Sequence, residues 1–135
     1  MINAIQHLNY LSVLLAAVAY FALGALWYSK VLFASQWIEM TKVDANDRSG
    51  MARVMITGFL YTLLIVFVTG VMIHLSRCHT FIDCIQVGIM LGVGYAVGIL
   101  GMTYGYGKKP LMLLAIDAGY HIIGITLASA ILAKM

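Results

Sequence analysis

Long apolar stretches alternate with short polar connections along this chain. Four stretches are apolar almost throughout: Leu8–Trp27, Val54–Leu75, Ile85–Tyr104 and Leu111–Ala133. Asp117 is the one Asp, Glu, Lys or Arg within them. A helix of about 20 apolar residues crosses the ~30 Å hydrocarbon core of a bilayer. The pattern therefore predicts an all-α integral membrane bundle, a single transmembrane domain over residues 1–135. Its four transmembrane helices are expected at about residues 8–28, 52–75, 81–106 and 110–133.

The connection between the first two helices has a pattern of its own. Apolar residues, among them Phe33 and Trp37, alternate there with polar ones such as Gln36 and Glu39. This mixture favours a short amphipathic segment that lies on the membrane interface. An irregular loop with aromatic anchors is the alternative.

Composition and charge agree with a membrane location. Apolar residues make up 63% of the chain and charged residues 10%, whereas soluble domains have about 25% charged residues. The net charge of +3 lies in the connections, so nucleic acid is not an expected partner. Basic residues are enriched in cytoplasmic loops. Loops 29–53 and 107–110 hold six bases, against two in the second connection and the C-terminus, and are therefore predicted to be cytoplasmic, with both termini outside.

Two helix starts carry local signals. Thr80 and Asp83 have the spacing of a capping box, in which both side chains bond free backbone amides at a helix start. Pro110 suits the first turn of the last helix, where no amide donor is needed.

The third helix is rich in glycine. Small residues four apart let two membrane helices approach closely. The interpretation we favour is packing within the bundle, and the alternative is a subunit interface. Glycines also permit bending of this helix. The residues concerned are Gly88, Gly92, Gly94, Gly98, Gly101 and Gly105.

Asp117 and His121 are the strongest candidates for function. They lie four apart and so share one helical face. At ~1.5 Å per residue from Pro110, they lie about 10 Å and about 16 Å into the membrane. Ionisable groups at such depth need a partner or a cavity. They could form a proton relay or ligand site, or a buried polar clasp with the first helix. Further residues that could take part are Tyr120, Trp27, Tyr28 and Ser29.

The second connection offers a weaker metal hypothesis. Potential ligands are His74, Cys78, His79 and Cys84. Two Cys and two His can close a tetrahedral zinc site, but this spacing matches no standard zinc pattern. Two free cysteines, or a Cys78–Cys84 disulfide, are preferred to a metal.

Two motifs carry a family resemblance. The first is Leu23-Gly24-Ala25-Leu26-Trp27-Tyr28-Ser29, followed by Leu32-Phe33 and Trp37, and the second is Ile116-Asp117-Ala118-Gly119-Tyr120-His121. Together they resemble the signatures of a bacterial membrane family catalogued as domain of unknown function 1761. The resemblance covers nearly the whole chain. It implies a small four-helix integral membrane protein, expected in the bacterial cytoplasmic membrane, and no activity.

The motifs of common enzymes are not found in this sequence. It has no Walker motif and no Gly-x-Ser-x-Gly elbow, so neither a phosphate cradle nor a hydrolase site is indicated. We expect no cofactor and no catalysis. The favoured function is a self-associating membrane protein whose Asp117–His121 pair binds a small molecule or lipid, or stabilises packing. A proton-coupled transporter or channel that uses this pair, and metal binding at residues 74–84, are the alternatives.

Overall fold

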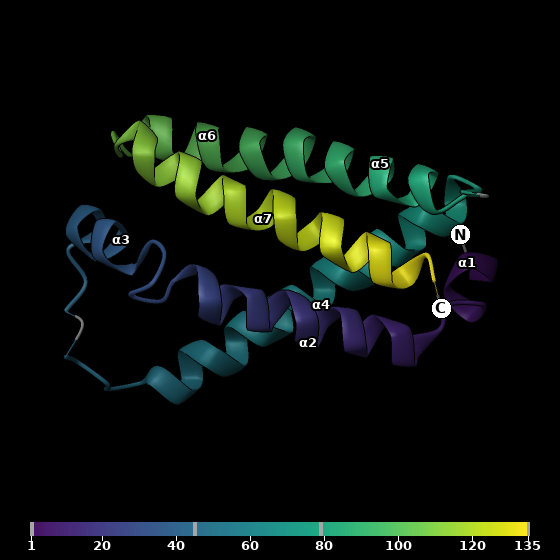
Figure 1. Cartoon of the computed structure of the whole chain (residues 1–135), viewed down its shortest axis with the longest axis horizontal. Helices are drawn as coiled ribbons and strands as arrows, with labels where there is room; N and C mark the ends of the chain where they lie inside the picture. The colour runs from purple at the N-terminus through teal and green to yellow at the C-terminus, as the bar shows by residue number, and fades with distance from the viewer. Residues whose placement is uncertain (1, 45, 79, 135) are drawn as a thin grey trace.

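The protein is a bundle of helices, as the apolar pattern predicts. The computed structural model describes residues 2–44, 46–78 and 80–134. Within them, four helical segments are long and apolar enough to cross a membrane. Figure 1 shows their arrangement. The elements are α1 (Ile2–Gln6), α2 (Tyr10–Trp27), α3 (Ala34–Thr41), α4 (Met51–Leu75), α5 (Phe81–Leu91), η1 (Gly92–Val97), α6 (Gly98–Tyr106) and α7 (Leu111–Leu132).

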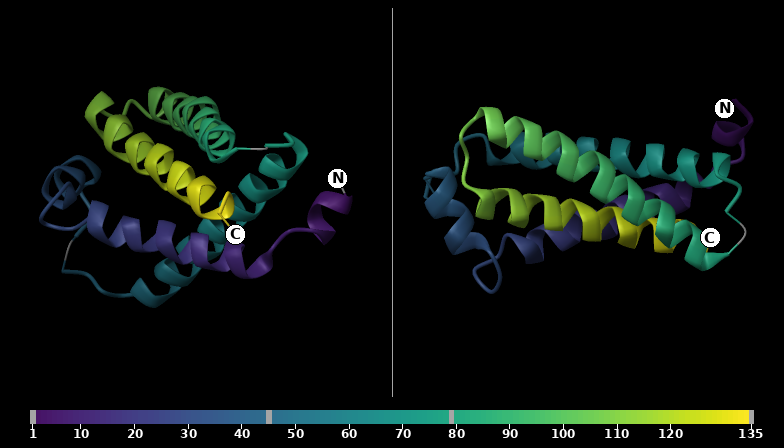
Figure 2. Two further views of the ribbon diagram at one scale, coloured as in Figure 1. Left: turned by 45° about the vertical axis from the view of Figure 1, so that its right-hand side comes forward. Right: turned by 90° about the horizontal axis from the view of Figure 1, so that it is seen from above.

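Helix α7 lies at the centre of the bundle. It contacts α2 and α4 on one side and α5, η1 and α6 on the other. Figures 1 and 2 show both chain ends at one end of the bundle, together with α1 and the connection from α4 to α5. We call this the terminal end. Helix α3 and the turn between α6 and α7 lie at the opposite end.

The predicted helix starts are reproduced with small shifts. The Thr80 hydroxyl accepts from the Asp83 amide at 3.1 Å and the Asp83 carboxylate accepts from the Thr80 amide at 3.0 Å, which confirms the capping box. Pro110 is the N-cap of α7, one residue before the predicted first turn. Helix α2 begins at Tyr10, two residues later than predicted, because the Asn9 side chain caps it by accepting from the Ser12 amide.

Two features were not predicted. The short helix α1 precedes α2, and the helix predicted over residues 81–106 is interrupted by the π-helical segment η1. A π-helix closes i→i+5 hydrogen bonds and accommodates an extra residue per turn. Gly92 and Gly94 fall within it, so the bending expected of the glycines takes the form of a local widening of the helix.

The amphipathic segment folds as helix α3, and it is attached to α2. The Phe33 ring lies 4.9 Å from the Trp27 ring, and the Trp37 ring lies 5.6 Å from the Tyr28 ring, measured between centroids. Lys42 ends the helix in the left-handed conformation, with φ at 57°. The aromatic face of α3 therefore packs on the last turn of α2.

Helices α2 and α7 pack through a reciprocal pair of tyrosines and glycines. A Cβ at Gly124 would overlap the ring of Tyr20, and a Cβ at Gly24 would lie 2.9 Å from the Tyr120 hydroxyl oxygen. The two rings are 5.2 Å apart between centroids. Each helix has a tyrosine followed four residues later by a glycine. Since the helices run in opposite directions, each tyrosine covers the glycine of the other helix.

We predict that Gly124→Ala destabilises the protein strongly. The new methyl group would overlap the fully buried Tyr20 ring, and overpacking of this kind costs about 1–3 kcal/mol or more. Unfolding in mixed detergent micelles, followed by circular dichroism, measures the change. Gly58→Ala is the control, because its new methyl group would meet only the Phe21 ring at 3.6 Å, an ordinary contact. A loss of stability equal in the two variants would contradict the reciprocal packing.

Candidate functional site

The Asp117 carboxylate joins three helices. It lies on α7 and is 7% exposed. The Tyr28 hydroxyl, from the end of α2, donates to Oδ1 at 2.7 Å. The Tyr104 hydroxyl, from α6, donates to Oδ2 at 2.6 Å. Both carboxylate oxygens are therefore bound by phenols from neighbouring helices.

These two bonds compensate for burying the carboxylate. A charged group deep in a bilayer costs at least a few kcal/mol. Short hydrogen bonds to an ionised acceptor are roughly twice as strong as neutral ones. Since an ionised carboxylate can accept at both oxygens, two phenol donors satisfy Asp117 without a basic partner.

Trp27 adds a contact one residue earlier in each helix. Its indole N–H donates to the backbone carbonyl of Ile116 at 3.0 Å. A Cβ at Gly119 would lie 3.3 Å from the same indole ring, so this glycine lets the ring lie close against α7. The end of α2 is thus bound to α7 by consecutive residues, Trp27 and Tyr28.

His121 has a different partner from Asp117. Its Nδ1 atom lies 2.6 Å from the hydroxyl oxygen of Tyr20, in hydrogen-bond contact. Tyr20 is fully buried. Among the described residues no hydrogen bond joins Asp117 to His121, so the direct pairing that their spacing suggested is replaced by two separate tyrosine contacts.

Two other candidate residues have packing positions. Tyr120 lies among aromatic rings, within 5.5 Å of the rings of Tyr20, Tyr28 and His121 between centroids. The Ser29 hydroxyl accepts from the Val31 amide at 3.3 Å, in the turn after α2. Ser29 therefore shapes the chain that follows the site, whereas the bonds to Asp117 come from the two tyrosines.

Tyr104 was not among the predicted site residues. It lies three residues before Gly107, whereas Asp117 lies seven after Pro110, so a rise of ~1.5 Å per residue puts them at different depths. The length of a tyrosine side chain bridges that difference. The usable signal was the short α6–α7 turn, which makes the two helices antiparallel neighbours.

His121 also lines a groove in the side of the bundle. The groove has a volume of about 590 Å³ and lies between α4, α7 and the η1 region. Helix α4 is near α5 at the terminal end and diverges from α6 toward the other end (Figure 1). Asp117 is not among the lining residues, which are Leu64, Ile65, Val68, Thr69, Met72, Leu91, Tyr95, Ala96, Ile99, Leu100, His121 and Ile125.

The glycines of the third span divide into two groups. A Cβ at Gly88 would overlap Ser129, and one at Gly92 would lie 2.8 Å from the Ile122 Cα atom, so these two lie directly against α7. A Cβ at Gly101 would lie 3.8 Å from the Leu114 side chain, an ordinary contact. At the remaining three, a Cβ would enter space with no described neighbour within 4 Å: Gly94, Gly98 and Gly105.

The described residues of the metal hypothesis do not form a metal site. Cys78 and Cys84 are free thiols, and the His74 ring stacks on His7 with centroids 6.5 Å apart. The hypothesis also included His79, which lies outside the described residues. Within the described part of the chain, no group of three or more His, Cys, Asp or Glu side chains is placed to hold a metal ion.

Comparison with known proteins gives one match. A family model described as "Protein of unknown function (DUF1761)" matches residues 11–133. No curated protein and no solved structure matches the chain. The matched residues include Tyr28, Tyr104 and Asp117, which form the site described above.

We predict that Tyr104→Phe and Tyr28→Phe each lower stability by about 1–3 kcal/mol, because each removes a hydrogen bond to a charged group. Denaturation of the purified protein in detergent measures the loss. Asp117→Asn should lower stability as well, and its combination with Tyr104→Phe should cost less than the sum of the two changes.

Tyr61→Phe is the matched control for these tyrosine variants, since that side chain is 68% exposed. Strict additivity of Tyr104→Phe and Asp117→Asn would show that the hydroxyl and the carboxylate do not interact.

Proposed function

Since the chain belongs to the DUF1761 family, whose function is unknown, we propose its function from the site itself: a membrane protein that binds an uncharged, largely apolar molecule from the bilayer in the groove beside His121. The hydrogen bonds from Tyr28 and Tyr104 to Asp117 stabilise the bundle around this groove. Binding, and not catalysis, is the activity we propose. The observation that carries the proposal is a partly exposed imidazole in the lining of a mostly apolar groove.

His121 has one nitrogen available to a ligand. Tyr20 occupies Nδ1 at 2.6 Å, and among the described residues no hydrogen bond is made by Nε2. The hydroxyl of Thr69, another polar lining residue, is already used, since it donates to the Ile65 carbonyl at 2.8 Å. A ligand in the groove could therefore bond to Nε2 of His121, and the exposed Tyr95 side chain adds a hydroxyl to the lining.

The depth of His121 narrows the class of ligand. Counted from Pro110 at ~1.5 Å per residue, His121 lies about 16 Å along the helix, close to the middle of a ~30 Å hydrocarbon core. Charged lipid headgroups are excluded from that depth by their desolvation cost. A neutral carbonyl or hydroxyl on an apolar body, such as the ring of an isoprenoid quinone, suits both the depth and a lining with few hydrogen-bonding groups.

The size of the groove supports a small-molecule site. Pockets that bind small ligands usually measure about 300–1,000 Å³ and are mostly apolar with a few polar groups. The groove beside His121 has a volume of about 590 Å³.

The surroundings of Asp117 argue against proton transport, and so favour ligand binding in the groove as the function. A relay through Asp117 would need its carboxylate to exchange protons with a cavity or with water. Both of its oxygens are instead bound by phenols, and it does not line the groove. The carboxylate is better explained as part of the packing.

We predict that a photoreactive isoprenoid quinone labels the protein saturably in nanodiscs, at residues of α4 and η1. His121→Leu should weaken labelling up to about tenfold, the value of one neutral hydrogen bond. Ala96→Trp should abolish labelling by filling the groove, whereas Ala22→Trp, on the exposed face of α2, should not. Equal labelling of all four proteins, or equal competition by an alkane of the same length, would contradict the proposal.

We also propose that copies of the chain associate through the outer face of η1 and α6. Gly94, Gly98 and Gly105 are exposed and have open space where a side chain would stand. A second helix could approach this face closely and gain dispersion contacts that lipid chains do not provide as well.

The expected effect of Gly98→Leu is a shift to smaller species in cross-linking and light-scattering measurements in detergent. Ala22→Leu adds comparable bulk on the exposed face of α2 and should leave the size unchanged. An unaltered mass for Gly98→Leu would exclude this face as the interface.

A further inference from the structure

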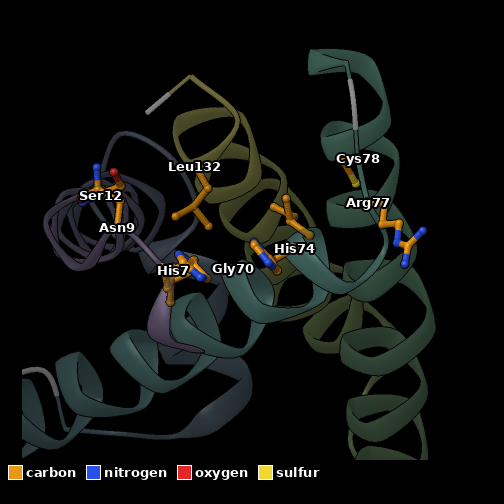
Figure 3. A pocket seen from close by; sticks show the side chains of 10 residues that line it. His7, Asn9, Ser12, Gly70, His74, Arg77, Cys78 and Leu132 are labelled. Atoms are coloured by element: carbon orange, nitrogen blue, oxygen red, sulfur yellow. The ribbon is translucent and has the colours of Figure 1, made fainter. Parts of the chain in front are cut away.

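A second pocket lies at the terminal end of the bundle, away from Asp117. Its volume is about 440 Å³. Figure 3 shows its polar side chains arriving from different elements: His7 and Asn9 before α2, Ser12 in the first turn of α2, and His74 near the end of α4. The Leu132 side chain forms part of an apolar wall.

The polar lining of this pocket is basic. The rings of His7 and His74 are nearly parallel, 9° apart in orientation, with centroids separated by 6.5 Å. Figure 3 shows them side by side in the centre of the pocket. Arg77 lies at the rim beyond His74. Arg77 is positively charged and none of the lining residues is Asp or Glu, so the local charge favours an anion.

Ser12 supplies an independent observation. Its side chain is 1% exposed, and its hydroxyl oxygen has no hydrogen-bond partner among the described residues. Three other buried hydroxyls, those of Thr62, Thr69 and Ser129, donate to the carbonyl four residues earlier in their helices. For Ser12 that residue is Leu8, which precedes the start of α2. A buried unpaired hydroxyl costs about 1–3 kcal/mol, and a bound ligand would remove that cost.

The ends of two helices also affect the charge of the pocket. The amino end of α2 carries the positive end of its dipole, which favours an anion. Three carbonyls at the carboxyl end of α4, those of Met72, His74 and Ile73, accept from the amides of Ser76, Arg77 and Cys78. The carboxyl end of α4 carries the negative end of its own dipole, and the positive charge of Arg77 at this end offsets it.

We propose that this pocket binds a phosphate group, with the Ser12 hydroxyl as the buried donor and His7, His74 and Arg77 as basic donors. A tetrahedral oxyanion can accept from several donors, and Figure 3 shows His7 and His74 between Ser12 on one side and Arg77 on the other. The group could belong to a lipid headgroup, with Leu132 beside its chains, or to free phosphate. A cation is disfavoured by Arg77 and by the lack of a lining carboxylate.

The test measures thermal stability of the full chain in dodecyl maltoside, with two probes. Inorganic phosphate represents the free ion. Phosphatidylglycerol represents the headgroup, and diacylglycerol with the same chains is its phosphate-free counterpart. We expect saturable stabilisation by at least one phosphate-bearing probe and none by diacylglycerol. Response to phosphatidylglycerol alone assigns a lipid headgroup, and response to inorganic phosphate assigns the free ion.

Two serine variants separate binding from folding. Ser12→Ala should leave stability without phosphate unchanged or higher, because it removes an unpaired buried hydroxyl, and should weaken phosphate binding about tenfold. Ser129→Ala should lower stability with and without phosphate and leave affinity unchanged, since that hydroxyl already bonds the Ile125 carbonyl.

His74→Gln should also weaken binding, and His121→Leu, which alters the groove, should not. The proposal is overturned if neither phosphate-bearing probe stabilises the protein, or if Ser12→Ala and His74→Gln bind phosphate as tightly as the unaltered chain. Neither outcome bears on the groove beside His121.

Discussion

The bundle depends on how one carboxylate is accommodated. Asp117 is the one Asp, Glu, Lys or Arg within the four apolar stretches, and it lies on the helix that contacts nearly every other. Without partners, its charge would oppose membrane insertion by several kcal/mol. Tyr28 and Tyr104 bind its two oxygens from opposite sides of α7. The same contacts fix α2 and α6 against the central helix.

The packing of the helices around Asp117 explains the position of the groove beside His121. The reciprocal contacts of Tyr20 with Gly124 and of Tyr120 with Gly24 hold α2 close to α7, and Gly88 and Gly92 do the same for α5 and η1. Helix α4 has fewer contacts with the α5–α6 side, so the space between them remains open and His121 lines it. Tyr20 connects the α2–α7 contact with the groove, since it packs on Gly124 and contacts the His121 ring nitrogen.

The long helices could be predicted from the sequence because lipid requires each spanning segment to satisfy its own backbone, which leaves a long apolar run. The Thr80–Asp83 capping box is equally local. The contacts of Asp117 could be predicted only in part: the end of α2 was a candidate, whereas Tyr104 depends on the relative depth of two helices. The π-helical segment begins at Gly92, where the chain lies directly against Ile122 of α7, and the Tyr20–His121 contact joins residues 101 positions apart. The pattern of apolar and polar residues along the chain does not specify such contacts between distant residues.

Solid-state NMR of the protein in lipid bilayers, with carbon-labelled aspartate and tyrosine, tests the role of this carboxylate most directly. The structure predicts that the Asp117 carboxylate carbon shows through-space contacts to the ring carbons bearing the hydroxyls of both Tyr28 and Tyr104. Contacts of that carboxylate with lipid acyl chains, and none with the two tyrosines, would contradict it.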